Sequence, residues 1–153
     1  MKKPFGEHAK LHHVGLVVAS ISKSAPECEI FEDPVQKVRV AFTQVQNLTL
    51  ELVEPLGEDS PVRESLNKGS KLLHLCYETE GLDSVIASLK GSEFRCLAQP
   101  VPAVAFEGRR IAWTFHPTFG LIELLEKRSA APAAGRTGSA LRGRAGGSRA
   151  RRG

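Results

Sequence analysis

KLHHVGLVV at residues 10–18 and KLLHLCYE at residues 71–78 are two copies of one pattern, and the chain is organised around them. Each copy is a short apolar run with a lysine at its start and a histidine close behind. Residues 11–18 include several β-branched side chains and no proline, which is typical of a buried strand. The repeat therefore predicts two strands of the same kind, one in each half of the chain.

A second apolar run, with one glutamate near its middle, follows each copy. These runs are LTLELV at residues 48–53 and GLIELL at residues 120–125. The order along the chain is therefore histidine then glutamate, twice. Because a buried charge is costly unless it is paired or bound to a metal, we expect the four side chains to meet at one metal ion. The four candidate ligands are His13, Glu51, His74 and Glu123.

Strand alternation decides which of two adjacent histidines belongs to this group. Successive side chains of a strand point to opposite faces. Aligning the two copies places His13 opposite His74, and His12 opposite Leu73. We therefore expect His13 at the site and His12 at the sheet edge or in solvent. Cys76 shares a face with His74, and we expect it to pack in the core.

This donor set favours a divalent metal ion. Two imidazoles and two carboxylates suit Zn²⁺, Mn²⁺, Co²⁺, Ni²⁺ or Fe²⁺, and affinity alone does not choose among these ions. Four protein ligands on a six-coordinate ion would leave two positions for water or substrate oxygens. Such an ion would act as a Lewis acid that stabilises an enolate formed next to a carbonyl group.

The two halves are predicted to be unequal in length. Each half should contain a strand, a helix and further strands, and residues 82–89 show helical spacing of apolar side chains. The corresponding stretch of the first half, residues 19–27, can supply about one helical turn. The first histidine-to-glutamate interval is 38 positions and the second is 49. The first half is therefore shortened. Residues 103–106 and 110–115 are expected to form a hairpin.

Length and composition are those expected of one cytoplasmic domain. The chain has 153 residues, of which 41% are hydrophobic, which is enough for a core. No apolar run approaches the roughly 18 residues that cross a membrane. The first residues contain no apolar secretion segment, and the three cysteines form no close pair, so we expect reduced thiols.

The domain boundaries follow from composition and the repeat. We divide the chain into a polar leader at 1–9, one domain at 10–128 with modules 10–56 and 71–128, and a tail at 129–153. The tail carries six arginines and no acidic residue, so the rest of the chain has a net charge near −2 although the whole has +4. We expect this Ala-, Gly- and Arg-rich tail to be disordered. It has no aromatic residues, so we do not expect nucleic acid as a partner.

These residues resemble the vicinal oxygen chelate superfamily, which includes glyoxalase I, extradiol dioxygenases and methylmalonyl-CoA epimerase. The segments ELVEPLGEDSP at 51–61, IAWTFHP at 111–117 and GLIEL at 120–124 most resemble the epimerase. The resemblance covers residues 10–127. It implies an α+β fold of paired βαβββ modules whose curved mixed sheets surround a metal site. The ligands carried over by resemblance are His13, Glu51, His74 and Glu123.

The resemblance also implies an activity. An epimerase-like isomerase would remove and return the α-proton beside a metal-bound carbonyl of a small molecule such as an acyl-CoA, with Glu123 as ligand and base. A second acid is harder to place, because the strand at 37–45 has no carboxylate and Glu32 or Asp33 would have to reach in. The alternatives are a non-catalytic ligand-binding member and a glyoxalase-, lyase- or dioxygenase-type activity. A homodimer would cover apolar side chains that the short first helix leaves exposed.

Overall fold

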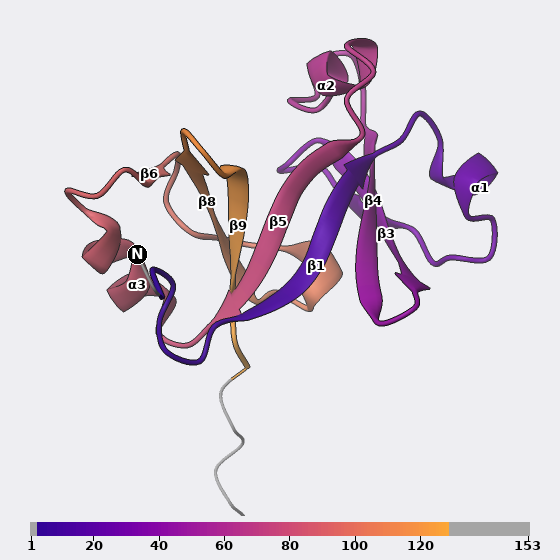
Figure 1. Cartoon of the computed structure of the whole chain (residues 1–153). Helices are drawn as coiled ribbons and strands as arrows, with labels where there is room; N and C mark the ends of the chain where they lie inside the picture. The colour runs from indigo at the N-terminus through magenta and orange to yellow at the C-terminus, as the bar shows by residue number, and fades with distance from the viewer. Residues whose placement is uncertain (1–2, 129–153) are drawn as a thin grey trace, which may run out of the picture.

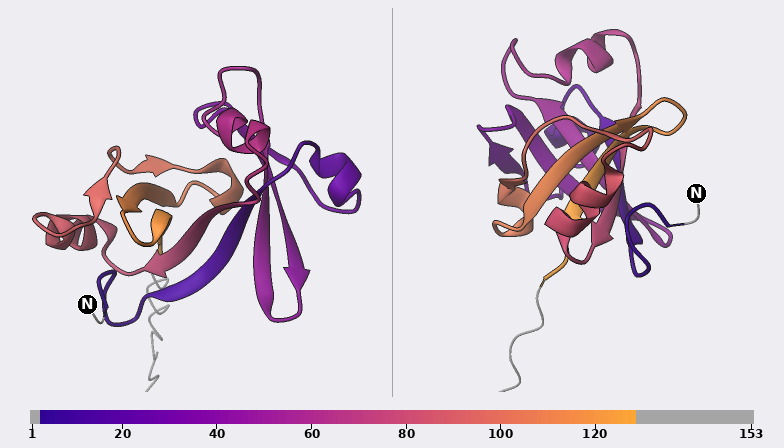
Figure 2. Two further views of the ribbon diagram at one scale, coloured as in Figure 1. Left: turned by 45° about the horizontal axis from the view of Figure 1, so that its top comes forward. Right: turned by 90° about the vertical axis from the view of Figure 1, so that its left-hand side faces the viewer.

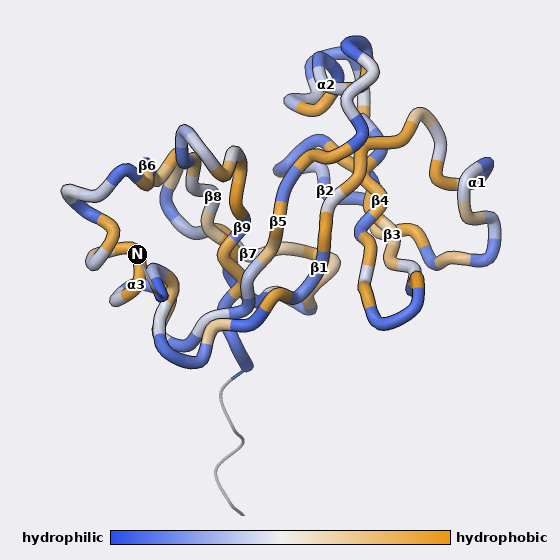
Figure 3. Tube along the Cα trace, viewed as in Figure 1, coloured by the Kyte–Doolittle hydropathy of each residue, from blue (hydrophilic) through white to orange (hydrophobic). Residues whose placement is uncertain are grey.

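The two copies of the repeated pattern form the central strands of one sheet (Figure 1). They are β1 (Lys10–Val17) and β5 (Leu72–Thr79), which pair antiparallel. The computed structural model describes residues 3–128. Figure 3 shows apolar residues along the central strands and polar residues in many of the loops, as the strand pattern requires.

Each half of the chain adds a helix and further strands to its central strand. The first half contains α1 (Ile21–Ser24), β2 (Phe31–Asp33), β3 (Val38–Val45) and β4 (Leu48–Pro55). The second half contains α3 (Leu82–Leu89), β6 (Arg95–Cys96), β7 (Val101–Pro102), the 3-10 helix η1 (Val104–Phe106), β8 (Arg110–His116) and β9 (Gly120–Glu126). The short helix α2 (Arg63–Asn67) lies between the halves.

The strand order repeats the same arrangement on both sides of the central pair. Within residues 3–128 the order is β2-β3-β4-β1-β5-β9-β8-β6, and β7 also pairs with β8. β4 is parallel to β1, and β9 is parallel to β5. Figure 2 shows the outer strands turning away from the plane of the central pair, so the sheet is curved. The predicted α+β fold of paired modules on a curved mixed sheet is confirmed.

The first module is shortened where the sequence predicted. Helix α1 has four residues, against eight in α3. Its one buried residue, Ile21, is fully enclosed and packs with Ala25, Ala41 and Leu52. Leu16 and the neighbouring Val18 pack against this cluster and are half-buried. One helical turn therefore covers this part of the sheet only in part.

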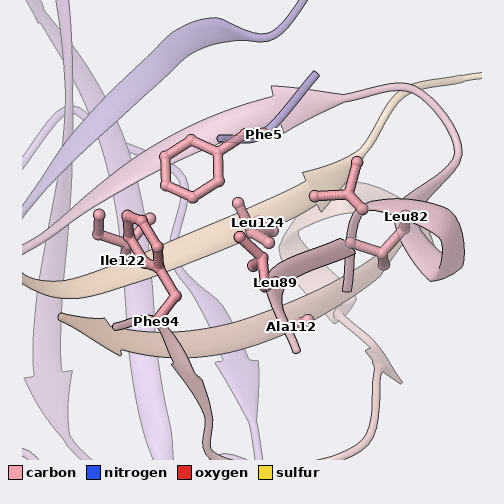
Figure 4. Packing of buried hydrophobic residues seen from close by; sticks show 8 residues of the cluster. Phe5, Leu82, Leu89, Phe94, Ala112, Ile122 and Leu124 are labelled. Carbon is pink, nitrogen blue, oxygen red and sulfur yellow. The ribbon is translucent and has the colours of Figure 1, made fainter. Parts of the chain in front are cut away.

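Eight buried apolar residues form a core cluster of the second module (Figure 4). Apolar residues of α3 pack against β8 and β9, and also against Phe5 and Phe94. The buried members are Phe5, Leu82, Val85, Leu89, Phe94, Ala112, Ile122 and Leu124. Phe5 comes from the leader, and its carbonyl oxygen accepts a hydrogen bond from the Thr79 hydroxyl. The leader is therefore tied to the second module.

The expected strand at 103–106 is wrong. The segment forms η1, and the strand that pairs with the start of β8, at Arg110 and Ile111, is β7, which lies nearer the N-terminus. Glu107 and Gly108 both have positive φ, and Gly108 N donates to the Ala103 carbonyl oxygen. A wide turn therefore replaces the tight hairpin.

Two further predictions concern the ends of the chain and membranes. The predicted disordered tail at 129–153 lies outside the described residues. No helix among residues 3–128 is both long enough and apolar enough to span a membrane.

Ile21 should carry much of the stability of the first module. Truncation of Ile21 to Ala leaves a cavity that α1 cannot fill, and such changes cost about 2–5 kcal/mol. Urea unfolding should show a loss in this range for Ile21→Ala. The exposed Lys23→Ala on the same helix should stay within about 0.5 kcal/mol of wild type. Equal stability of the two variants would contradict this packing role.

Candidate metal centre

The register of the central strands places two predicted ligands on either side of a glycine. Gly15 of β1 pairs with Glu51 of β4 and with His74 of β5. Paired residues on neighbouring strands project from the same face of a sheet. Glu51 and His74 therefore point to the same side, above a position that has no side chain.

The other two predicted ligands, His13 and Glu123, lie in an equivalent row of paired residues that is centred on Cys76. Cys76 of β5 pairs with His13 of β1 and with Glu123 of β9. The two rows correspond through the repeat, with β5 and β9 in the places of β1 and β4. Burial is the main reason that the pKa of the Cys76 thiol is raised, and the Glu123 carboxylate adds to it. Cys76 is thus a small neutral core residue, as predicted.

The two rows bring the four predicted ligands to one point. Their donor atoms all lie within 4.8 Å of one another, and all four residues are buried. The Nε2 atoms of His13 and His74 are 3.1 Å apart. Glu51 Oε2 lies 3.4 Å from the first of these atoms and 3.2 Å from the second. Glu123 Oε2 lies 3.2 Å and 3.7 Å from the same two atoms.

These spacings fit a single divalent ion. Ligands about 2.0–2.2 Å from one ion stand about 2.8–3.6 Å apart in octahedral or tetrahedral geometry. The buried atoms without a hydrogen-bond partner in residues 3–128 include Glu123 Oε2 and His74 Nδ1. A buried carboxylate oxygen with no hydrogen bond is costly unless a cation lies beside it. The donor set and its geometry therefore fit a metal.

The four groups also shift one another's protonation. Burial acts to lower the pKa of His13, but Glu123 and Glu51 outweigh this effect and raise the pKa to about 9. Burial acts to raise the pKa of Glu51, but His13 and His74 outweigh it and lower the pKa to about 2. A proton on His13 thus offsets part of the negative charge, and a metal ion would have to displace that proton.

A glycine is required at position 15 because the His74 ring lies very close to the backbone of β1. A Cβ atom at this position would lie 2.1 Å from His74 Cε1 and 2.3 Å from His74 Nδ1. Both distances are far below any normal contact. The imidazole of His74 therefore lies directly over the bare backbone of β1, which brings its Nε2 next to that of His13.

A cavity of about 620 Å³ opens onto these side chains. Glu51, His74 and Glu123 line it, together with apolar residues of both halves. The apolar lining includes Val38, Val40, Val53, Leu73, Ala103, Phe106 and Trp113. Polar residues, among them Gln36, Lys37 and Asp59, also contribute to the lining. A mostly apolar cavity with a few convergent polar groups is typical of a small-molecule site.

Two aromatic residues that the sequence did not identify support the histidines. The Phe106 ring stacks on His13 at 5.8 Å between centroids, and the Trp113 ring meets His74 edge-on at 4.9 Å. Trp113 could have been found by register, because it pairs with Glu123. Phe106 lies in η1, where no strand pattern applies.

Neither candidate for the second acid reaches the ligands. Asp33 is buried, but its Oδ1 accepts hydrogen bonds from the backbone N–H groups of Val35 and Gln36, and its Oδ2 accepts from Gln36 Nε2. Glu32 forms an ion pair with Arg39 on the surface. Asp33 therefore holds the β2–β3 turn, and Glu32 is engaged outside the cavity.

The expected orientation of His12 is wrong. The pairing of β1 with β5 shifts register between Leu11 and His13, and His12 has no partner on β5. This bulge breaks the alternation and turns the half-buried His12 towards His13, with 2.9 Å between their Nδ1 atoms. Burial is the main cause that lowers the pKa of His12, followed by the charges of His13 and Arg109.

Comparison with known proteins places this site in a family. The model of the Glyoxalase/Bleomycin resistance protein/Dioxygenase superfamily matches residues 12–113. The chain belongs to this superfamily.

Its relatives include methylmalonyl-CoA epimerases. The mitochondrial methylmalonyl-CoA epimerase of Homo sapiens is 30% identical over 103 residues, which are 60% of this chain and 58% of that protein. The uncharacterized protein YqjC of Bacillus subtilis is 33% identical over 131 residues, which are 78% of this chain and 93% of that protein. A crystal structure of a hypothetical protein from Bacillus halodurans has a TM-score of 0.66 at 27% identity, and covers 82% of this chain and 99% of that one.

The match to the mammalian epimerases is partial in length. The chain spans 58% of the human enzyme and 60% of the mouse enzyme. The comparison thus identifies the superfamily.

Gly15→Ala should damage the centre without removing a ligand. The added methyl group displaces the His74 ring, so Zn²⁺ affinity should fall at least about tenfold, and overpacking should cost about 1–3 kcal/mol of stability. The matched control is Cys76→Ala at the equivalent place in the second row, which adds no atoms and should retain Zn²⁺ binding. Unchanged affinity in Gly15→Ala, measured by chelator competition, would contradict the close approach.

Proposed function

We propose that the chain is a divalent-metal-dependent isomerase of the epimerase type, which removes and returns a proton next to a carbonyl group. The observation that carries the proposal is the meeting of two imidazoles and two carboxylates within 4.8 Å beside a cavity of about 620 Å³. His13, Glu51, His74 and Glu123 would hold the ion. A bound divalent ion supplies Lewis-acid stabilisation of the negative charge that develops on a carbonyl oxygen.

Glu123 is the proposed base. Its Oε2 is buried without a hydrogen-bond partner in residues 3–128, and the residue lines the cavity. A carboxylate in this position can accept the α-proton of a substrate in the cavity on the oxygen that does not bind the ion, and hold it there until it is returned. The apolar walls, including Val40 and Val53, limit the access of water to the proton.

The proposed proton transfer is one-sided. Within the described residues, the carboxylates that line the cavity besides Glu51 and Glu123 are Asp33 and Asp59. Asp33 is engaged by the β2–β3 turn, and Asp59 forms an ion pair with Lys37. Inversion at carbon needs a proton delivered to the opposite face of the enolate. We therefore expect return of the proton to the original face to be faster than inversion.

The proposed substrate class is an acyl-CoA, on the strength of the methylmalonyl-CoA epimerases among the relatives. The cavity volume lies within the range of small-molecule sites. We also propose that the working form is a homodimer, since apolar side chains of β1 next to the short α1 are only half-buried. The proposed location is the cytoplasm.

The second candidate function is non-catalytic binding of a small ligand at the same site. The engagement of Asp33 in its turn favours this candidate, because no second acid is free at the cavity wall among residues 3–128. A glyoxalase-, lyase- or dioxygenase-type activity on the same donor set is the third candidate from the sequence, and no further residue of the site favours it.

The test is proton exchange in D₂O. Metal-loaded protein incubated with each C2 epimer of methylmalonyl-CoA should incorporate deuterium at the α-carbon, measured by mass spectrometry, faster than it inverts the configuration. Glu123→Gln should slow exchange by at least about 100-fold. Glu126→Gln, on the same strand but paired with Arg110 away from the centre, should leave it unchanged. Ligand binding without metal-dependent exchange would favour the non-catalytic candidate.

A further inference from the structure

The bulge in β1 places His12 next to the metal centre, although strand alternation predicts that it faces away from it. Leu11 pairs with Tyr77 and His13 pairs with Cys76, so His12 is an extra residue opposite no partner on β5. Bulges of this kind redirect a side chain and occur often beside active sites. The rings of His12 and His13 meet edge-to-face at 5.2 Å between centroids.

The nitrogen atoms of His13 divide into an inner and an outer one. Nε2 faces His74, Glu51 and Glu123, at the distances given above. Nδ1 faces His12 Nδ1 at 2.9 Å. To bind an ion through Nε2, that atom must offer its lone pair, so the proton of neutral His13 sits on Nδ1. His13 Nδ1–H then donates to His12 Nδ1, which accepts.

The His12 ring is itself held in place. It packs edge-on against Phe106 at 5.7 Å between centroids, and the same Phe106 ring stacks on His13. The guanidinium of Arg109 lies over Phe106 at 5.6 Å and pairs with Glu78 at 2.7 Å. The acceptor atom of His12 is therefore fixed by packing that is independent of any metal.

The two metal-site histidines differ in this support. His74 Nδ1 is buried and has no hydrogen-bond partner within residues 3–128. The His74 ring is placed by close packing over Gly15 and against Trp113. His13 is instead oriented by a hydrogen bond to its outer nitrogen, the kind of contact that tunes metal ligands in many proteins.

We propose that His12 is a positioning residue of the metal centre, which accepts a hydrogen bond from His13 Nδ1–H and thereby selects the tautomer with a free Nε2. His12 does not touch the ion or the substrate. It fixes the rotation of the His13 ring and its proton. The proposal rests on the metal site of the proposed function, and its test separates the two.

The test is metal affinity rather than activity. Zn²⁺ affinity is measured by chelator competition on the full chain. His12→Phe keeps a flat ring but removes the acceptor, and affinity should fall about 10- to 100-fold. His12→Asn places an amide oxygen near the Nδ1 position and should restore affinity to within about threefold of wild type. The matched control is His8→Phe, the same change at an exposed histidine of the leader, which should have no effect.

Two further measurements distinguish failure of the metal site from failure of the positioning role of His12. His74→Ala should abolish Zn²⁺ binding; if it does not, the metal site fails and takes the role of His12 with it. If His74→Ala loses the ion while His12→Phe binds as wild type, the positioning role alone is overturned. Should His12→Phe fold poorly, ¹⁵N NMR of the Zn²⁺-loaded wild type decides: we expect the His13 proton on Nδ1, and a proton on Nε2 would contradict the proposal.

Discussion

Burial of two carboxylates and two imidazoles at the centre of one sheet is the constraint on which the rest of the structure depends. Each buried carboxylate costs several kcal/mol unless its charge is matched nearby. A proton on His13 offsets only one of the two negative charges of Glu51 and Glu123. A divalent ion with neutral imidazoles balances both charges and uses every inward-facing donor atom, including Glu123 Oε2, which no hydrogen bond satisfies within residues 3–128.

The repeat made this centre predictable from sequence. Strand periodicity identifies the face of His74 and Glu123, and the two-fold recurrence of histidine and glutamate joins four separate residues into one site. The same reasoning failed at His12, because a bulge inserts one residue between Leu11 and His13 and breaks the alternation there. No propensity in residues 10–18 marks that bulge. The strand expected at 103–106 also failed, because residues 104–106 form the 3-10 helix η1 and the connection into β8 runs from Ala103 to Arg109.

The hydrogen bonds of the first module also could not be predicted from the sequence. Asp33 was a candidate acid because the strand at 37–45 has no carboxylate, yet the backbone N–H groups of its own turn occupy it. The short α1 leaves β1 partly covered, while the larger core under α3 holds the second module. The superfamily fold is thus retained with an uneven distribution of packing. Glu51 of the first module and Glu123 of the second nevertheless line the same cavity.

The four buried side chains are expected to form one metal site, and calorimetric titration of metal-free protein with Zn²⁺ tests this in wild type and in Glu51→Ala. Wild type should bind one ion per chain. Glu51→Ala should lose at least about 100-fold in affinity, since it removes one of the four ligands. No saturable binding in wild type, or stoichiometric binding of equal affinity in Glu51→Ala, would show that the four side chains do not form one site.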